Sequence, residues 1–379
     1  MIKIENYSAG KTVKHPSGYA YFLPNAINDS WVWQDQDINA LLEKAAIKLG
    51  ELNSFSKLVP NIDLFIQMHV TKEAVISSRI EGTQTRMDEA LLDEEDISPE
   101  RRNDWQEVTN YIKAINQAIE ELATLPISSR LIKRTHQVLL HSVRGEHKLP
   151  GEYRRSQNWI GGNTLLDAVF IPPHHDHVNE LMGDLEKFIN NENIKVPTLI
   201  KIAIAHYQFE TIHPFLDGNG RIGRLLITLF LVEQKILSKP LLYLSVFFEK
   251  KKSLYYDNLT FVRTKNDIKQ WLKYFLVGIA ETAENATQTL SSILELKAKL
   301  ENTINDKFGK KANKANLLLQ YLLKKPIVNV NQVKTITKSS YKTANDLVND
   351  FVNNGLLKEM TGQNRNRLFV FEEYIKLFK

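Results

Sequence analysis

The sequence predicts a mainly α-helical protein, and three observations support this fold class. Apolar residues recur at spacings of three and four through most of residues 37–143, as they do on the inner face of an amphipathic helix. The segments 199–205 and 225–232 have almost no polar face, which is typical of buried helices. Only short stretches combine glycine, proline and aromatic residues in the way that favours turns and strands, so we expect few strands.

Composition sets limits on the function. The chain has 379 residues, enough for two or three domains, with 43% hydrophobic and 25% charged residues, as in an ordinary globular protein. It contains no cysteine, which excludes disulfides, thiolate catalysis and zinc–thiolate sites. The first residues lack the apolar core of a secretory signal, and no uncharged apolar run is long enough to span a membrane. We therefore expect a cytoplasmic protein that does not enter a membrane.

The elements before residue 150 are expected in the following order. Residues 1–35 contain glycines and prolines beside several aromatic residues, which predicts an irregular arm packed on the body. Four helices follow, the first ending at Gly50 and the second ending before Gly82. Their expected spans are about 37–49, 61–81, 105–122 and 127–143.

Residues 151–173 have a different character. A glycine pair, Gly161-Gly162, separates two short apolar stretches, so we expect a small β-hairpin here. His174, His175, Asp176 and His177 come next, and these residue types can bind a metal. Two prolines precede them, however, and Asp176 is well placed as the N-cap of the helix that follows. A loop with a helix cap therefore explains this cluster without a metal.

The C-terminal part is basic. Residues 307–379 carry twelve Lys and two Arg against two Asp and three Glu, while the rest of the chain is slightly acidic. A basic terminal domain favours a nucleic-acid or acidic-protein partner. The alternative explanation of this charge is that lysine is simply the usual surface residue in this protein.

The last elements predict a winged helix. One long helix over about 271–305 leads to three short helices and a β-hairpin, at about 315–323, 330–337, 341–351 and 356–371. If this domain binds DNA, its third helix enters the major groove and its hairpin meets the backbone. The residues that would then contact DNA are Lys338, Ser340, Lys342 and Thr343 on the helix side and Arg365 and Arg367 on the hairpin. Packing or dimerisation through the same domain is the alternative.

The most informative stretch is residues 213–224, His-Pro-Phe-Leu-Asp-Gly-Asn-Gly-Arg-Ile-Gly-Arg. Its three glycines allow the backbone to approach a ligand closely. A helix that begins near Asn219 would direct free N–H groups and its positive dipole end at an anion. Arg221 and Arg224 lie on one face of that helix, and arginine binds phosphate through two N–H groups at once.

Two further groups in this stretch suit nucleotide chemistry. Asp217 is a hard oxygen ligand of the kind that Mg²⁺ takes beside phosphates. His213 is the group that can accept a proton near neutral pH. Together these residues indicate transfer of a phosphorus group from a nucleotide. The alternative is a buried polar turn whose arginines pair with acidic neighbours.

The stretch matches every fixed position of the signature HPFxDGNGRxGR, so the sequence resembles the Fic-domain proteins. Most of these are adenylyltransferases, which move AMP from ATP onto a hydroxyl of a target protein. The resemblance implies that His213 deprotonates the target hydroxyl and that Asp217 holds Mg²⁺. It also implies that the phosphates of ATP are bound by Gly218, Asn219, Gly220, Arg221 and Arg224. Of these, Arg224 would bind the terminal phosphate.

A second, shorter motif lies on the N-terminal side. Ser77, Glu81 and Gly82 fit the pattern S/T-x-x-x-E-G/N of the inhibitory helix that some Fic proteins carry. The resemblance implies that Glu81 pairs with Arg224 and so keeps ATP from binding productively. A surface glutamate before a terminating glycine is the alternative.

Two other segments gain expectations from the resemblance. In Fic proteins a hairpin flap pairs its edge with an extended segment of the target, and a later segment walls the adenine. The candidates here are Val169, Phe170 and Ile171 for the flap, and Tyr255, Tyr256 and Asn258 for the adenine. Ordinary structural packing is the alternative for both segments.

These observations lead to one overall prediction. We expect a Fic-type helical bundle with a small β-hairpin flap and a C-terminal winged helix, divided at about 1–103, 104–250, 251–306 and 307–379. The expected activity is Mg²⁺-dependent AMP transfer from ATP to a Ser, Thr or Tyr hydroxyl of an unidentified protein and of the chain itself. Two rival functions remain. The chain could remove AMP from a modified protein with the help of Glu81, or it could be a DNA-binding regulator whose Fic domain senses nucleotides. A homodimer would be compatible with either.

Overall fold

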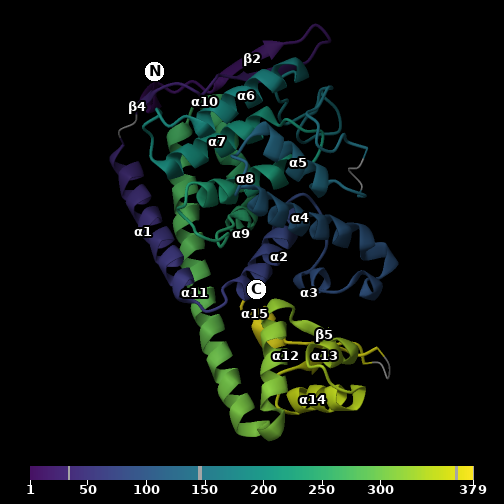
Figure 1. Cartoon of the computed structure of the whole chain (residues 1–379). Helices are drawn as coiled ribbons and strands as arrows, with labels where there is room; N and C mark the ends of the chain where they lie inside the picture. The colour runs from purple at the N-terminus through teal and green to yellow at the C-terminus, as the bar shows by residue number, and fades with distance from the viewer. Residues whose placement is uncertain (33–34, 144–146, 363–365, 379) are drawn as a thin grey trace.

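The computed structural model describes residues 1–32, 35–143, 147–362 and 366–378. Helices make up most of it, and they form a body at one end and a smaller C-terminal domain at the other (Figure 1). The helices of the body are α1 (Gln36–Leu58), α2 (Asp63–Ile80), α3 (Met87–Ala90), α4 (Arg102–Glu121), α5 (Ser129–Leu139), α6 (Val178–Asn190), α7 (Thr198–Ile212), α8 (Asn219–Glu233), α9 (Ser245–Lys250) and α10 (Lys252–Lys265). The mainly helical prediction is confirmed.

The centre of the body is formed by α7 and α8. Nearly every residue of both helices is buried, as their lack of a polar face predicts. Helices α4 and α2 pack against α8, and α6 packs against α7. The loop between α7 and α8 is therefore fixed on several sides by the core of the molecule.

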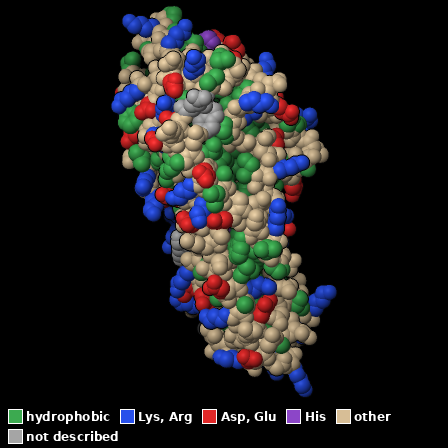
Figure 2. Space-filling model, turned by 90° about the vertical axis from the view of Figure 1, so that its left-hand side faces the viewer, with side chains coloured by type: hydrophobic (Ala, Val, Ile, Leu, Met, Phe, Trp, Pro, Cys, Tyr) green, Lys and Arg blue, Asp and Glu red, His purple; other side chains and the backbone are tan. Residues whose placement is uncertain are grey.

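Helix α11 (Ile268–Lys307) connects the body to the C-terminal domain, and α1 packs alongside it (Figure 1). The expected stop of the first helix at Gly50 is wrong, because α1 continues without a break to Leu58. Packing against α11 outweighs the low helix propensity of one glycine, which is only about 1 kcal/mol. Ion pairs such as Lys273–Asp37, at 2.6 Å, also join the two helices. Figure 2 shows basic and acidic side chains interspersed over this face of the molecule.

The N-terminal arm is more regular than the sequence indicates. Strands β2 (Gly10–Lys14) and β3 (Ala20–Pro24) form an antiparallel hairpin, while β1 (Ile2–Lys3) and β4 (Trp31–Val32) pair in parallel. Among the aromatic residues expected to pack on the body, Tyr21, Phe22 and Trp31 are buried, whereas Tyr19 is only partly buried and Trp33 lies outside the described residues. Strand β3 also extends its pairing to another segment, because the backbone N–H of Phe22 donates to the carbonyl of Ile171 at 3.0 Å.

The C-terminal domain contains the helices and the hairpin that the sequence predicts, together with one more strand and one more helix. Its elements are α12 (Ala312–Lys324), β5 (Ile327–Asn329), α13 (Val330–Ile336), α14 (Tyr341–Asn353), β6 (Lys358–Glu359), β7 (Leu368–Val370) and α15 (Glu372–Lys376). The three strands form one antiparallel sheet in the order β5-β7-β6. The side chain of Arg367 is engaged inside the domain by Glu359 and Asn345, and Arg365 lies outside the described residues. DNA binding by this domain stays a prediction.

Among the described residues, no helix combines the length and the apolar character needed to cross a bilayer.

Candidate active site

Two residues in the left-handed conformation shape the loop between α7 and α8. His213 ends α7 with a φ of 51°, and Gly218 starts α8 with a φ of 76°. The left-handed region is uncommon for a residue with a side chain, so His213 is held there by its surroundings. The expected helix start near Asn219 is confirmed, and its N–H groups open toward the loop.

Asn219 stabilises the loop from inside. Its side-chain Oδ1 accepts from the backbone N–H of Phe215 at 2.8 Å, and its Nδ2 donates to the carbonyl of the same residue at 2.8 Å. Its side chain is buried and fully engaged. The expected contribution of Asn219 to an anion site is thus limited to its backbone.

Two residues that sequence reasoning did not single out also hold the loop. Arg154 is buried, and its guanidinium donates to the carbonyls of His213 at 2.9 Å and of Pro173 at 2.5 Å. The Nδ2 group of Asn158 donates to the carbonyl of Phe215 at 2.9 Å. Both residues lie in the segment 151–173, and no local pattern marks them, since their partners in the loop lie more than fifty positions away in the sequence.

His136 is a third anchor, which the sequence left without a role. Its ring stacks on Phe215 with a centroid separation of 3.7 Å. Its Nδ1 accepts from the backbone N–H of Gly151 at 2.9 Å, so the proton must be on Nε2, which donates to the carbonyl of Asp217 at 2.9 Å. Burial lowers the pKa of His136 to about 4, which keeps the ring neutral.

His213 has the properties of a neutral base. Burial, with a further contribution from the charge of Arg154, lowers the pKa of the imidazole to about 3. Within the part of the chain that the structure describes, its buried Nδ1 has no hydrogen-bond partner. The ring is therefore neutral at physiological pH and able to accept a proton.

Asp217 and Arg221 lie at the start of α8. The Asp217 side chain is 45% exposed, and its Oδ1 accepts from the N–H of Gly218 at 2.5 Å. The Arg221 side chain is buried and lies 3.4 Å from Glu107 and 3.5 Å from Asp217. A buried polar turn whose arginines pair with acidic neighbours, the alternative to a phosphate site, would show these contacts. Both distances are long for ion pairs, however, so a phosphate could bind the Arg221 guanidinium more strongly.

Arg224 forms hydrogen bonds with Ser77 and Glu81 of the second motif. Its Nη2 donates to Glu81 Oε1 at 2.7 Å and to the carbonyl of Ser77 at 2.9 Å, while its Nε donates to Ser77 Oγ at 2.8 Å. Although burial acts to raise the pKa of Glu81, the charge of Arg224 outweighs it and lowers that pKa. Both partners are therefore charged at neutral pH.

The backbone around this ion pair requires glycine at two positions. Gly82 follows the end of α2 with a φ of 105°, as expected of a residue that terminates a helix. A Cβ at Gly220 would lie 2.3 Å from Glu81 Oε1 and 2.8 Å from Arg224 Nη1. Only glycine at position 220 lets the Glu81 carboxylate come this close to the first turn of α8.

The expected flap is smaller than a full hairpin. Ile160 and Phe170 exchange two backbone hydrogen bonds, at 2.8 and 3.0 Å, and form an isolated bridge. The Phe170 ring lies under the guanidinium of Arg263, which is 3.7 Å from the ring centroid. Val169 is the most exposed of the three candidates, at 78%. The carbonyl of Ile171 is already used by Phe22 of β3, so the arm covers part of the flap edge.

The three adenine candidates differ in position. Tyr255 is buried, and its hydroxyl donates to His206 Nε2 at 2.9 Å, which in turn lets His206 Nδ1 donate to the carbonyl of Gly223 at 2.8 Å. Asn258 is also buried, and its Nδ2 donates to a carbonyl one turn earlier in α10. Both therefore serve the packing that the alternative described. Tyr256 is 38% exposed and lies within electrostatic range of Glu81 and Arg224.

The histidine cluster is organised differently from its prediction. Asp176 does not cap the helix that follows, because no side-chain cap is formed at the start of α6. Its carboxylate instead lies 3.1 Å from His174 Nδ1 and 3.6 Å from His175 Nε2. These three side chains could hold a metal ion, and the buried Nδ1 of His175 has no hydrogen-bond partner among the described residues.

Family models match two adjacent segments of the chain. The model of the Fic/DOC family N-terminal domain matches residues 39–120, and the model of the Fic/DOC family matches residues 126–231. The second match contains the loop between α7 and α8. The first contains α2 with Ser77 and Glu81.

Curated relatives are similar over the same region. The chain is 31% identical over 125 residues to the protein adenylyltransferase Fic of Drosophila erecta, and 33% identical over 126 residues to that of Aedes aegypti. Each match covers 33% of this chain, and the chain spans only 22% of the length of either relative.

Solved structures share the fold. A Fic family protein from Desulfovibrio desulfuricans superposes with a TM-score of 0.55 at 19% identity and covers 89% of this chain and 96% of its own. A Fic domain containing signaling protein from Bacteroides thetaiotaomicron gives a TM-score of 0.53 at 20% identity, covering 67% of this chain and 96% of its own. Residues 39–120 and 126–231 thus match the models of the Fic/DOC family N-terminal domain and of the Fic/DOC family, and the chain shares its fold with solved Fic proteins.

Proposed function

We propose that the chain is a protein adenylyltransferase, which transfers AMP from ATP to a hydroxyl of a target protein and of itself. The observation that carries the proposal is the convergence of His213, Asp217 and the N-terminus of α8 in one loop fixed by the core. The names of the curated relatives support the same activity.

In this mechanism the target hydroxyl oxygen attacks the α-phosphorus of ATP. A phosphorus–oxygen bond forms to the target, the bond to pyrophosphate breaks, and the hydroxyl proton moves to the neutral imidazole of His213. The N–H groups at the start of α8 would face the phosphates, where a helix N-terminus favours negative charge. Positioning and charge stabilisation would provide most of the rate enhancement.

Asp217 is the residue that would hold Mg²⁺. Its partly exposed carboxylate has one oxygen engaged by Gly218 and keeps the other for a hard cation, so the residue fits this metal. Bound Mg²⁺ would neutralise phosphate charge. Arg221 would exchange its long contacts with Glu107 and Asp217 for phosphate oxygens.

We also propose that Glu81 inhibits the reaction in cis. Three hydrogen bonds from Arg224 to Ser77 and Glu81 leave this guanidinium unavailable to a terminal phosphate. A carboxylate beside the α8 N-terminus would in addition repel the triphosphate. Release of Glu81 is then a condition for productive ATP binding.

Removal of AMP is the second candidate function, and one observation favours it. The Glu81 carboxylate is 34% exposed and close enough to His213 to act on its pKa. A carboxylate at this place could position a water for attack on a protein-bound AMP. Incubation of AMP-modified target with Mg²⁺, followed by measurement of free AMP, separates the two activities.

The test of the main proposal is a His213→Ala variant with labelled ATP and Mg²⁺. Transfer of α-label to protein should be abolished, while ATP binding should be largely retained because the ring is not a phosphate ligand. Replacement of the exposed His147 by alanine is the matched control and should leave transfer unchanged. Retained transfer in His213→Ala would remove the assigned base.

A further inference from the structure

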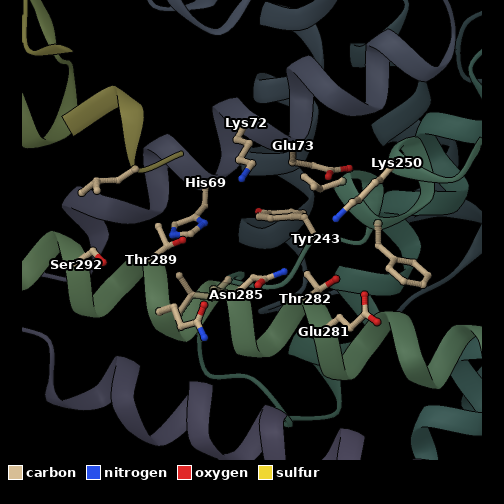
Figure 3. Close-up of a pocket in the computed structure, with 16 residues that line it drawn as sticks. His69, Lys72, Glu73, Tyr243, Lys250, Glu281, Thr282, Asn285, Thr289 and Ser292 are labelled. Atoms are coloured by element: carbon tan, nitrogen blue, oxygen red, sulfur yellow. The ribbon is translucent and has the colours of Figure 1, made fainter. Parts of the chain in front are cut away.

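A cavity of about 370 Å³ lies against α2, away from the loop between α7 and α8. Helices α2, α9 and α11 and the segment around Leu241 form its walls, and Leu377 of the C-terminal domain closes one side (Figure 3). His69 and Glu73 line it from α2, two turns and one turn before Ser77. The cavity and the inhibitory motif are thus on one stripe of the same helix.

Two lysines face this cavity without a carboxylate partner. Figure 3 shows Lys72 from α2 and Lys250 from α9 pointing toward the middle of the cavity, on either side of Tyr243. Among the described residues, neither ammonium group takes part in an ion pair. Burial lowers the pKa of Lys72, which means that a bound anion would stabilise its charged form.

Buried polar atoms of the wall also have no partner. His69 Nε2, Glu73 Oε2 and the hydroxyl of Tyr243 accept or donate no hydrogen bond within the described parts of the chain. All three side chains are at least nine-tenths buried, with exposures of 8%, 2% and 7%. A buried polar atom left unpaired costs free energy, typically about 1–3 kcal/mol, so such groups usually indicate a ligand or a structured water.

The remaining wall combines hydroxyl and amide groups, the carboxylate of Glu281 and apolar surface. Thr282, Thr289 and Ser292 of α11 supply hydroxyls, while Val246 and Phe247 supply an apolar side. The volume falls in the range of small-molecule sites, about 300–1,000 Å³. An anionic head between the two lysines and an apolar body against Phe247 would match this distribution.

We propose that the cavity binds a small organic phosphate, held by Lys72 and Lys250, and that its occupancy stabilises α2. Lysine is a common ligand of phosphate. The carboxylates of Glu73 and Glu281 also line the cavity, but among the described residues neither forms an ion pair with Lys72 or Lys250. The ligand would connect α2 to α9 and α11 and restrict motion of the helix that carries Glu81.

A hydrogen-bond network extends from this site to the loop. Glu73 Oε1 accepts from Ser245 at 2.6 Å and from the Tyr111 hydroxyl at 3.2 Å. The same Tyr111 hydroxyl lies 3.0 Å from the carbonyl of Arg221 and 3.3 Å from Ser77 Oγ. Because a hydroxyl has one proton, Tyr111 can donate to Glu73 or to the Arg221 carbonyl, but not to both.

The experiment uses the full chain and phenyl phosphate as the probe, at constant ionic strength. Calorimetric titration should give saturable binding at millimolar concentrations or below. Lys72→Met and Lys250→Met should each weaken it by about tenfold or more, the effect of losing one charge-assisted hydrogen bond. Lys251→Met removes the neighbouring ammonium, which does not line the cavity, and should leave the affinity unchanged.

Hydrogen exchange gives a second readout. The probe should slow amide exchange over residues 63–80 in the wild type and have no such effect in Lys72→Met. Binding that survives both lysine substitutions but disappears in Arg221→Met would place the phosphate at the start of α8 and overturn the proposal. No saturable binding at millimolar probe would overturn it as well. Neither readout depends on AMP transfer, so failure of the proposed activity would leave this inference standing.

Discussion

Replacement of Glu81 by glycine is the most direct test of the inhibitory contact. The substitution removes a carboxylate that accepts from Arg224 at 2.7 Å but leaves both contacts of Arg224 with Ser77 in place. Position 81 ends α2 with φ near −87° and is followed by Gly82, so the fold around it tolerates a small residue. The variant should therefore fold normally, with Arg224 free to turn toward a phosphate.

The size of the effect follows from the kind of contact that is lost. A hydrogen bond between charged groups contributes about 1.5–3 kcal/mol. Because the Glu81 side chain is 34% exposed, solvent screening places the value at the lower end, about 1.5–2 kcal/mol. That corresponds to an increase of about 10- to 30-fold in productive ATP binding.

The assay compares wild type and Glu81→Gly with ATP labelled at the α- or the γ-phosphate. Only α-label should reach protein, and the variant should accumulate it about 10- to 30-fold faster at subsaturating ATP. Glu81→Gln keeps the length of the side chain but removes its charge, and should give an intermediate rate. Glu249→Gly is the matched control, because Glu249 lies near the end of α2, 3.8 Å from Arg79, and does not touch Arg224.

Two results would refute this reasoning. If Glu81→Gly transferred α-label no faster than Glu249→Gly while binding ATP equally well, the contact would not be the brake. If Glu81→Gly released AMP from modified protein more slowly than wild type and gained no transfer, Glu81 would belong to the removal reaction.

Further predictions concern stability and pH. Gly223→Ala should lower the free energy of unfolding by about 1–3 kcal/mol, because the added Cβ would lie 2.1 Å from the buried Glu210 Oε1. Gly183→Ala, whose added Cβ would have no atom within 4 Å, should instead raise the free energy of unfolding by about 0.5–1 kcal/mol. Chemical denaturation measures both changes. Burial raises the pKa of Glu73 from 4.5 to about 7, so the carboxyl stays protonated in the folded state at low pH. This adds about 3 kcal/mol to the free energy of unfolding at low pH, and the contribution is lost as the pH rises through 7. Glu73→Gln should accordingly lessen the fall in Tm between pH 5 and 8, and an unchanged slope would contradict the assignment. Because the pKa of His213 is about 3, kcat/KM of the Glu81→Gly variant should show no acid limb near pH 6.5, and an acid limb at that pH would contradict this low pKa or assign the proton transfer to another group.

The sequence could predict the reactive loop because its residues are neighbours in the chain. The lack of a polar face located the buried segments on both sides, and the glycines and arginines between them suit phosphate binding. The pairing of Glu81 with Arg224 was also accessible, although only through the family resemblance, since 143 positions separate the two residues.

The supporting contacts could not be predicted in the same way. Arg154, Asn158 and His136 reach the loop from distant segments, and their hydrogen bonds go to backbone carbonyls, which leave no trace in the sequence. Tyr255 and Tyr256 are adjacent and chemically alike, so only the direction of α10 decides which of them is buried. The backbone hydrogen bond from Phe22 to Ile171 was missed for a related reason, because the N-terminal arm gives too short an alternation to identify strands.

Helix α11 has a mechanical consequence for the whole molecule. At 40 residues it is about 60 Å long, so a tilt of about 5° at one end displaces the other by about 5 Å. The C-terminal domain that it carries returns to the body, where the ring of Phe378 meets His69 of α2 edge-on at 5.2 Å. Because the C-terminal domain contacts α2, the position of the far end of α11 is coupled to the helix that carries Glu81.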